Sequence, residues 1–399
     1  MKEPSEKSAE PKKKRQHFVP RFYLRNFSFE ADERINMVHI ERLRSISQVG
    51  VKGQCADDYF YGKDLTVENA LDKIEGATAT IIRACIDQRQ LPIPGSGDDF
   101  AFRTFVCLQQ GRTRSHAENS EALFDKALKA VHSPQLLASG VTQEQIDEVR
   151  VGTEYPGLFS LGMSAEFVPF MSDLQAKLVV AGSHGEFVTS DAPVVAINPY
   201  LIGRYPGSVT GLNSRGLVIL FPITPQLLAI FYDGQCYRVG APGKRVVSLE
   251  TRADLVALNN LQFLHADEAV YHHDEKLAAG HIVEFGKVAR MRSRDCNVVN
   301  EAFSTKPGDN SSLLHMYQED ISYRPAFSFI TLLRKRRGEF EPLSQIQERN
   351  HAISVLFDQY QRELRARLCK RGFLNYYAAH VFSKAGIPLP PFLCDPYSL

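Results

Sequence analysis

The chain lacks the features that would quickly place it in a well-known class of protein. Its seven cysteines are odd in number and widely spaced, with no C-x-x-C pair, which argues against a disulfide framework and against a cysteine-based zinc site. No run of about 20 apolar residues is long enough to span a bilayer, and the N-terminus has no apolar signal region. P-loop, G-x-G-x-x-G, G-x-S-x-G and kinase motifs are also missing. We therefore expect a globular, cytoplasmic protein in a reducing compartment, without a membrane partner.

Net charge is also small, at +1 over 399 residues, but it is unevenly distributed. From residue 286 onward the chain has 17 Lys and Arg against 11 Asp and Glu. The excess is concentrated in Arg334, Lys335, Arg336 and Arg337 and in Arg362, Arg365, Arg367, Lys370 and Arg371. Such a run can contact the phosphates of a nucleic acid, or it can be a solvated helix face. The sequence leaves both readings open.

Periodicity predicts an α+β fold, in which a mostly helical N-terminal layer packs on a mainly antiparallel sheet and a helical C-terminal extension follows. Residues 1–15 are expected to be a disordered basic tail. Residues 16–290 form the core domain, helical over 60–175 and sheet over 177–290. We expect a linker over 291–312 and the helical extension over 313–399, with its main helix at 344–371.

The predicted sheet rests on short apolar runs bounded by Gly, Pro, Asp and Ser, which are typical of strands. They cover residues 177–181, 186–189, 194–197, 217–221, 227–232 and 236–239. Asp233 and Gly234 between the last two runs are a hairpin signal, so the last three strands are expected to form an antiparallel meander.

The densest polar motif is Gln16 to Phe27, where a helix is expected to begin at Pro20. Arg21 and Arg25 stand four residues apart on this helix and repel each other, so they need counter-charges if they are buried. Glu68, Asp72 and Glu75 lie on one strip of the next predicted helix and are the expected partners.

Three further features can belong to one polar site. His17 stands at the mouth of the motif and can act as a base, a metal ligand or a packed core residue. Arg112 and Arg114 end a later helix, and Thr189, Ser190 and Asp191 follow a predicted strand, where a ligand site or an Asx turn is expected. A structural ion-pair network is the alternative reading of the same charges. His272, His273 and Asp274 suggest a metal but have no partner at a recognised spacing.

In combination these motifs resemble a known family. The segments His17–Phe27, Asp58–Gly62, Glu68 with Glu75, Arg112 with Arg114, and Phe187–Val194 occur in the order found in the family catalogued as domain of unknown function 4238. The similarity covers about residues 17–273. It implies a shared site at His17, Arg21, Glu75 and Asp191 but no particular reaction.

Two functional hypotheses follow. The first is a hydrolase that acts on phosphate esters, resembles a nuclease and uses a divalent metal. Its catalytic residues would be His17, Arg21, Glu75 and Asp191, with His17, Glu75 and Asp191 as ligands of a divalent metal and Arg25, Arg112, Arg114, Thr189 and Ser190 as substrate-binding residues. The second is a non-catalytic module that binds a nucleic acid or protein, in which these side chains only stabilise the fold.

Overall fold

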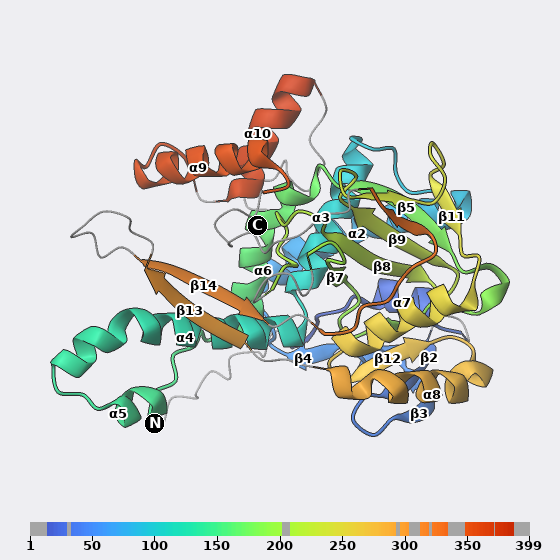
Figure 1. Cartoon of the computed structure of the whole chain (residues 1–399), viewed down its shortest axis with the longest axis horizontal. Coiled ribbons are helices and arrows are strands. Elements are labelled where there is room, and N and C mark those ends of the chain that lie inside the picture. The colour runs from blue at the N-terminus through green and yellow to red at the C-terminus, as the bar shows by residue number, and fades with distance from the viewer. Residues whose placement is uncertain are drawn as a thin grey trace, which may run out of the picture.

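The computed structural model describes residues 14–29, 33–201, 208–292, 296–302, 312–318, 321–333, 348–370 and 372–386 (Figure 1). Most of the predicted N-terminal tail and the basic run at residues 334–337 lie outside these ranges. No helix of the described residues is both long enough and apolar enough to cross a membrane.

Helices and strands both contribute to the described chain, which confirms the α+β prediction. The helices are α1 Arg21–Leu24, α2 Thr66–Gln88, α3 Gly97–Gly111, α4 Arg114–Ala138, α5 Gln143–Glu148, α6 Pro156–Phe167, α7 Arg252–His265, α8 Ala278–Val288, α9 His351–Arg365 and α10 Phe373–Ala385. The strands are β1 Arg15–His17, β2 Arg34–His39, β3 Arg44–Gly50, β4 Ala56–Asp58, β5 Gln175–Val180, β6 Thr189–Ser190, β7 Val195–Ile197, β8 Val218–Thr224, β9 Leu227–Tyr232, β10 Tyr237–Val239, β11 Val246–Ser248, β12 Ala269–His272, β13 Cys296–Ala302, β14 Ser312–Gln318 and β15 Ile330–Leu332.

The larger sheet has the order β11-β5-β9-β8-β7, and every pair in it except β11 with β5 is antiparallel. Both faces of its central strands are buried, so these strands are continuous apolar runs. On one face, Phe221 contacts Phe102 and Phe105 of α3. The opposite face packs against the apolar side of α7, including Leu258. This arrangement places the helical layer on one side of the sheet and α7 on the other.

The smaller sheet has the order β3-β2-β12-β6 and lies beyond α7 (Figure 1). Its strands are antiparallel, and α8 packs beside α7 through stacked rings of Phe263 and Phe285, whose centroids are 4.6 Å apart. Helix α7 therefore contributes to two cores, and the segment before β6 runs between them, with Phe187 in one core and Val188 in the other.

One expectation about local pairing was wrong. Strand β8 pairs with β9 as predicted, but β10 pairs with β15 instead of completing a meander with β9. The Asp233 carboxylate accepts hydrogen bonds from the backbone N–H groups of Gly216 and Gln235, which draws the chain after β9 away from a two-residue hairpin. The hairpin signal was local, whereas the partner of β10 is about 90 residues distant along the chain.

The C-terminal part is less uniformly helical than the sequence suggested. Strand β13 lies within the span predicted as a linker and pairs with β14, and β14 and β15 lie within the span predicted as a helical extension. The long helix expected over 344–371 is described from residue 348 and is helical only over His351–Arg365. Leu368 falls within the expected span but lies beyond the observed helix end and is 76% exposed.

Candidate functional site

The N-terminal motif is buried where the two sheets meet the helical layer. Strand β1 pairs with β4, and the short helix α1 carries Tyr23, which is fully buried. The Tyr23 hydroxyl lies 2.6 Å from Thr189 Oγ1 in the smaller sheet and donates to Pro222 O in the larger one at 2.7 Å. The motif therefore holds the two sheets together through one phenol group.

Arg112 organises the sequence-predicted residues on the helical side. Its Nη1 donates to Glu75 Oε1 at 2.7 Å, its Nε to the Tyr61 hydroxyl at 2.9 Å, and its Nη2 to the backbone oxygen of His17 at 2.8 Å. The side chain of Arg112 is 3% exposed and that of Glu75 is 21% exposed. Glu75 and the His17 backbone are thus brought to the same guanidinium.

His17 itself has an unusual environment. Its Nε2 is buried and has no hydrogen-bond partner. The pKa of His17 is lowered to about 4. Burial is the largest cause, and the positive charges of Arg21, Arg15 and Arg112 act in the same direction. The imidazole is therefore neutral at pH 7.

Asp191 is held by a different set of residues from those around Arg112. Its two carboxylate oxygens accept backbone N–H bonds from Asp267, Glu268 and Ala269 at 2.7, 2.6 and 3.0 Å. Burial nevertheless raises the pKa of Asp191 to about 6, because desolvation outweighs these three donors. The Glu268 side chain pairs with Arg114, which also forms a two-pronged pair with Asp57.

The hydroxyl groups beside Asp191 are occupied as well. Thr189 contacts Tyr23, while the Ser190 hydroxyl donates to Gln262 Oε1 at 3.0 Å. Together with Asp191, these residues fasten the strand end to α1, to α7 and to the loop before β12. This arrangement is the one expected of residues that stabilise the fold.

The expected partners of Arg21 and Arg25 were wrong. Both guanidinium groups face Glu33, at 3.7 Å from Arg21 Nη2 and 2.8 Å from Arg25 Nη2. Glu33 precedes β2 and is close in sequence, whereas Glu75 is held by Arg112. The three carboxylates on α2 share a strip, but that pattern does not reveal which guanidinium reaches them.

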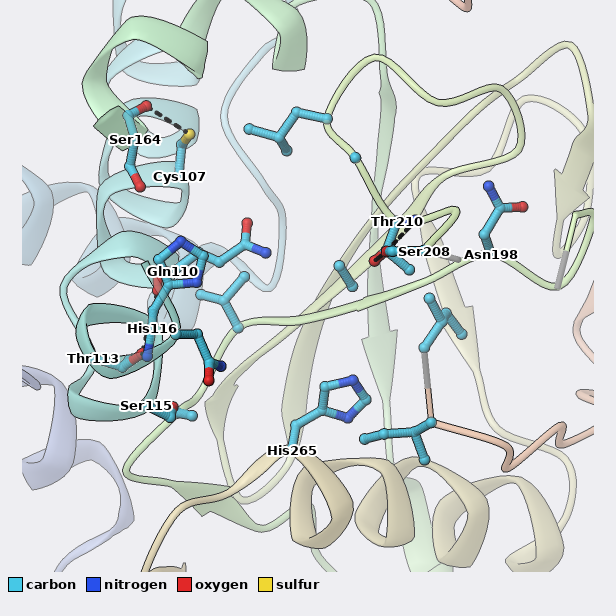
Figure 2. Close-up of a pocket in the computed structure, with 18 of the residues that line it drawn as sticks. Cys107, Gln110, Thr113, Ser115, His116, Ser164, Asn198, Ser208, Thr210 and His265 are labelled. Carbon is cyan, nitrogen blue, oxygen red and sulfur yellow. Dashed lines mark hydrogen bonds between the residues drawn. The ribbon is translucent and has the colours of Figure 1, made fainter. Parts of the chain in front are cut away.

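A cavity of about 570 Å³ opens between the start of α4, the end of α7 and the segments beside β7 (Figure 2). It falls within the volume range of small-molecule sites. Its lining borders the predicted motifs, since Thr113 follows Arg112 and Ala192 follows Asp191. Polar groups in the lining include Gln110, Ser115, His116, Asn119, Asn198 and His265. None of the described lining residues carries an Asp, Glu, Lys or Arg side chain.

Two histidines reach this cavity from opposite ends of two helices (Figure 2). His116 lies in the first turn of α4, whose N-cap Thr113 accepts its backbone N–H, and burial lowers the pKa of its imidazole. His265 is the last residue of α7, and its Nδ1 lies 2.9 Å from Leu261 O. The sequence reasoning missed both. Each is a lone histidine close to the end of a helix, and that position was the available signal.

The described residues contain one group of side chains that could hold a metal ion. One set of three or more His, Cys, Asp or Glu has ligand atoms within 4.8 Å of one another, and it consists of Glu186, His272 and His281. His17, Glu75 and Asp191 do not form such a set. Of these three, Glu75 is paired with Arg112 and Asp191 with backbone N–H groups.

Residues 15–276 match the family described as a protein of unknown function, DUF4238. This chain belongs to that family. The match includes the N-terminal motif, the residues around Arg112 and Asp191, and the whole of α7, but it ends before α8. No curated protein and no solved structure is detectably similar to the chain.

Proposed function

We propose that the chain is a hydrolase that binds an uncharged polar substrate in the cavity of Figure 2, with His265 as the general base and His116 as a hydrogen-bond donor to the substrate. The observation that supports this most is the pair of histidines facing a cavity whose described lining has no charged side chain. An anionic group entering it would lose its hydration without meeting a fixed counter-charge. Amide and hydroxyl groups in the lining instead suit an uncharged, hydrogen-bonding molecule.

His116 lies at the N-terminal end of α4 and His265 at the C-terminal end of α7, so we propose different roles for the two histidines. The N–H groups of the first turn of α4 carry partial positive charge, which together with burial keeps His116 neutral. A neutral imidazole can donate its N–H to a substrate oxygen that gains negative charge, as a preorganised hydrogen-bond donor. His116 is therefore proposed to stabilise the developing oxyanion.

His265 is proposed as the general base. Its Nδ1 faces a carbonyl oxygen, which can only accept a hydrogen bond, so the proton of the neutral ring resides on Nδ1 and the lone pair on Nε2. The carbonyl groups at the end of α7 stabilise the positive charge that forms when Nε2 takes a proton from water. Proton transfer of this kind contributes about 100-fold to 10,000-fold in rate.

Uncharged p-nitrophenyl substrates, the acetate ester and the glucoside, provide the test. His265→Gln and His116→Gln are expected to lower kcat by about 100-fold or more. His351→Gln is the matched control, because that imidazole is 84% exposed on α9. Turnover by both cavity variants at the wild-type rate, or none by the wild type on either substrate, would contradict this function.

A phosphoester-directed hydrolase centred on His17 is the second candidate. It is supported by the neutral, unpartnered Nε2 of His17 beside the positive charges of Arg15, Arg21 and Arg112, since a base among guanidinium groups suits an anionic phosphate. In this proposal Arg21 and Arg25 bind the phosphate, and His17 acts as the base.

Bis(p-nitrophenyl) phosphate with Mg²⁺ or Mn²⁺ separates the two candidates, because it carries the same chromophore on an anionic diester. If the second candidate is correct, the wild type hydrolyses this diester. His17→Gln abolishes the turnover, and His265→Gln leaves it intact. Turnover that survives in His17→Gln would remove His17 from any such mechanism.

A non-catalytic, nucleic-acid-binding role has one supporting feature. Arg362, Arg365, Arg367 and Lys370 are exposed at the end of α9 and just beyond it. If they bind phosphates, the double variant Arg365→Ala, Arg367→Ala weakens binding of a fluorescent single-stranded DNA and reduces the slope of log affinity against log salt by about 1.4. An unchanged slope would exclude these residues.

We also propose a cytoplasmic location. Cys55, Cys85, Cys107, Cys236 and Cys369 are free thiols, and the first four are buried, which suits a reducing compartment. Fractionation of the source cells, followed by detection with an antibody to this chain, tests the location directly.

A further inference from the structure

Three side chains from separate elements converge below the smaller sheet. Glu186 precedes β6, His272 ends β12 and His281 lies in the first half of α8. Their side chains are 5%, 0% and 12% exposed, and each offers a ligand atom within 4.8 Å of the others. The set lies apart from the cavity and from the N-terminal motif, so it stands independently of the proposed function.

The separations within this set suit a shared ion better than direct hydrogen bonds. His281 Nε2 lies 3.6 Å from Glu186 Oε1. This distance exceeds that of a hydrogen bond. Two ligand atoms each about 2.1 Å from a tetrahedral metal are separated by about 3.4 Å. A small movement of the side chains would bring them to that spacing.

Unsatisfied polar atoms point to the same conclusion. The Nε2 atoms of His272 and His281 are buried and have no hydrogen-bond partner. An unpaired polar atom is costly in the interior, and such atoms are rare in folded proteins. A metal ion bound by these nitrogens would remove the penalty at both positions.

The surroundings already orient two of the three groups. His272 Nδ1 lies 3.2 Å from Asp274 O, so Nδ1 donates to this carbonyl and the lone pair of the neutral ring is on Nε2. This bond is the usual outer contact of a metal-binding histidine. The Glu186 carboxylate is held by the backbone N–H groups of His273 and Asp274. The ring of His281 stacks on Phe285, with centroids 5.8 Å apart.

We propose that Glu186, His272 and His281 bind a divalent transition-metal ion of the zinc class, which ties α8 to the smaller sheet. Two imidazoles and one carboxylate favour Zn²⁺, Co²⁺ or Fe²⁺ over Mg²⁺ and Ca²⁺, which prefer oxygen ligands. Three protein ligands leave a coordination position for water. Glu186 and His272 lie within the family match, whereas His281 lies beyond it, so α8 completes the ligand set.

The sequence supplied only part of this site. It singled out His272 next to His273 and Asp274 but offered no partner at a recognised spacing. The partners are 86 residues earlier and nine residues later in the chain. Pairing of β12 with β6 and packing of α8 against α7 bring them together.

Metal binding by the full-length, tag-free protein tests the inference. After removal of metal with a chelator, the wild type is expected to bind one Zn²⁺ per chain in isothermal titration calorimetry. Co²⁺ is expected to give the visible absorption of a low-symmetry site that contains nitrogen ligands. Zn²⁺ is also expected to raise the thermal midpoint, because an ion that binds only the folded state stabilises it.

His281→Gln is the principal variant because His281 is the most exposed ligand, and circular dichroism checks that it folds. We expect at least about a 100-fold loss of Zn²⁺ affinity and no thermal shift on adding Zn²⁺. His273→Gln is the matched control, since its imidazole faces Ser28 O and not the cluster, and it should bind like the wild type. The absence of stoichiometric binding by the wild type, or equal binding by His281→Gln, would overturn the site. Neither result depends on hydrolytic activity.

Discussion

The guanidinium of Arg112 and the carboxylate of Glu75 form an ion pair of 2.7 Å that joins α2 to the end of α3. Arg112 is almost completely buried and also binds the Tyr61 hydroxyl and the His17 backbone. One side chain thereby fixes β1, the loop before α2, and both helices of the N-terminal layer.

Removing one partner of this pair is expected to be costly. In Arg112→Met, Glu75 keeps its charge without a partner, and the free energy of unfolding should fall by about 3–5 kcal/mol. Urea denaturation followed by circular dichroism measures the loss. Glu33→Gln is the control, because its pairs with Arg21 and Arg25 are partly exposed and should contribute less than about 1 kcal/mol. Equal losses in the two variants would contradict the structural role of Arg112.

A second anchor connects the C-terminal helices to the core. Arg349 Nε lies 2.9 Å from Asp173 Oδ2, its Nη1 donates to Ser214 O at 3.3 Å, and its Nη2 donates to Phe170 O. Its side chain is 1% exposed, immediately before α9. The docking of α9 and α10 thus begins at a buried guanidinium.

Arg349→Ala is expected to loosen that docking while the core remains folded. Hydrogen exchange measured by mass spectrometry should show faster exchange in α9 and α10, with the strands β8 and β9 unchanged. Arg365→Ala serves as the control, because Arg365 is exposed on the same helix. Protection of α9 at the wild-type level in Arg349→Ala would show that aromatic packing alone, such as Phe170 with Phe373, holds the helices in place.

Much of the fold follows from local sequence patterns. The helices of the N-terminal layer and the apolar strands β5, β8 and β9 were predicted, because the spacing of apolar residues reflects which face of an element is buried. The family resemblance was confirmed over residues 15–276. Pairings between distant segments, such as β10 with β15, leave no local trace and were not predicted.

The partners of the polar residues were also not predictable from local sequence patterns. A shared strip on α2 indicated that Glu75 needs a cation, but Arg112 and Arg21 were equally good partners by sequence alone. His116, His265 and His281 each occur singly in the chain, and only the packing of α4, α7 and α8 places them in a cavity or beside another ligand. Their chemistry depends on tertiary contacts, which periodicity does not encode.

The pH dependence of stability provides a test of His17. Burial lowers its pKa from 6.5 to about 4, so the folded state binds fewer protons than the unfolded state between these values. The stabilising contribution is complete above pH 6.5 and is lost as the pH falls through 4. His17→Gln should therefore lose less stability than the wild type on acidification from pH 7 to 4, as measured by urea denaturation. Parallel curves would show that the imidazole is not desolvated.

Asp191 is expected to show the opposite dependence. Burial raises its pKa from 3.8 to about 6, so the folded state binds more protons than the unfolded state in this interval. Its contribution is present below pH 3.8 and is lost as the pH rises through 6, amounting to roughly 3 kcal/mol. Asp191→Asn is less stable at every pH because its amide cannot accept all three backbone N–H bonds. The difference in unfolding free energy between wild type and variant should nevertheless shrink from pH 4 to pH 7. A difference that grows over this range would mean that the three donors outweigh desolvation.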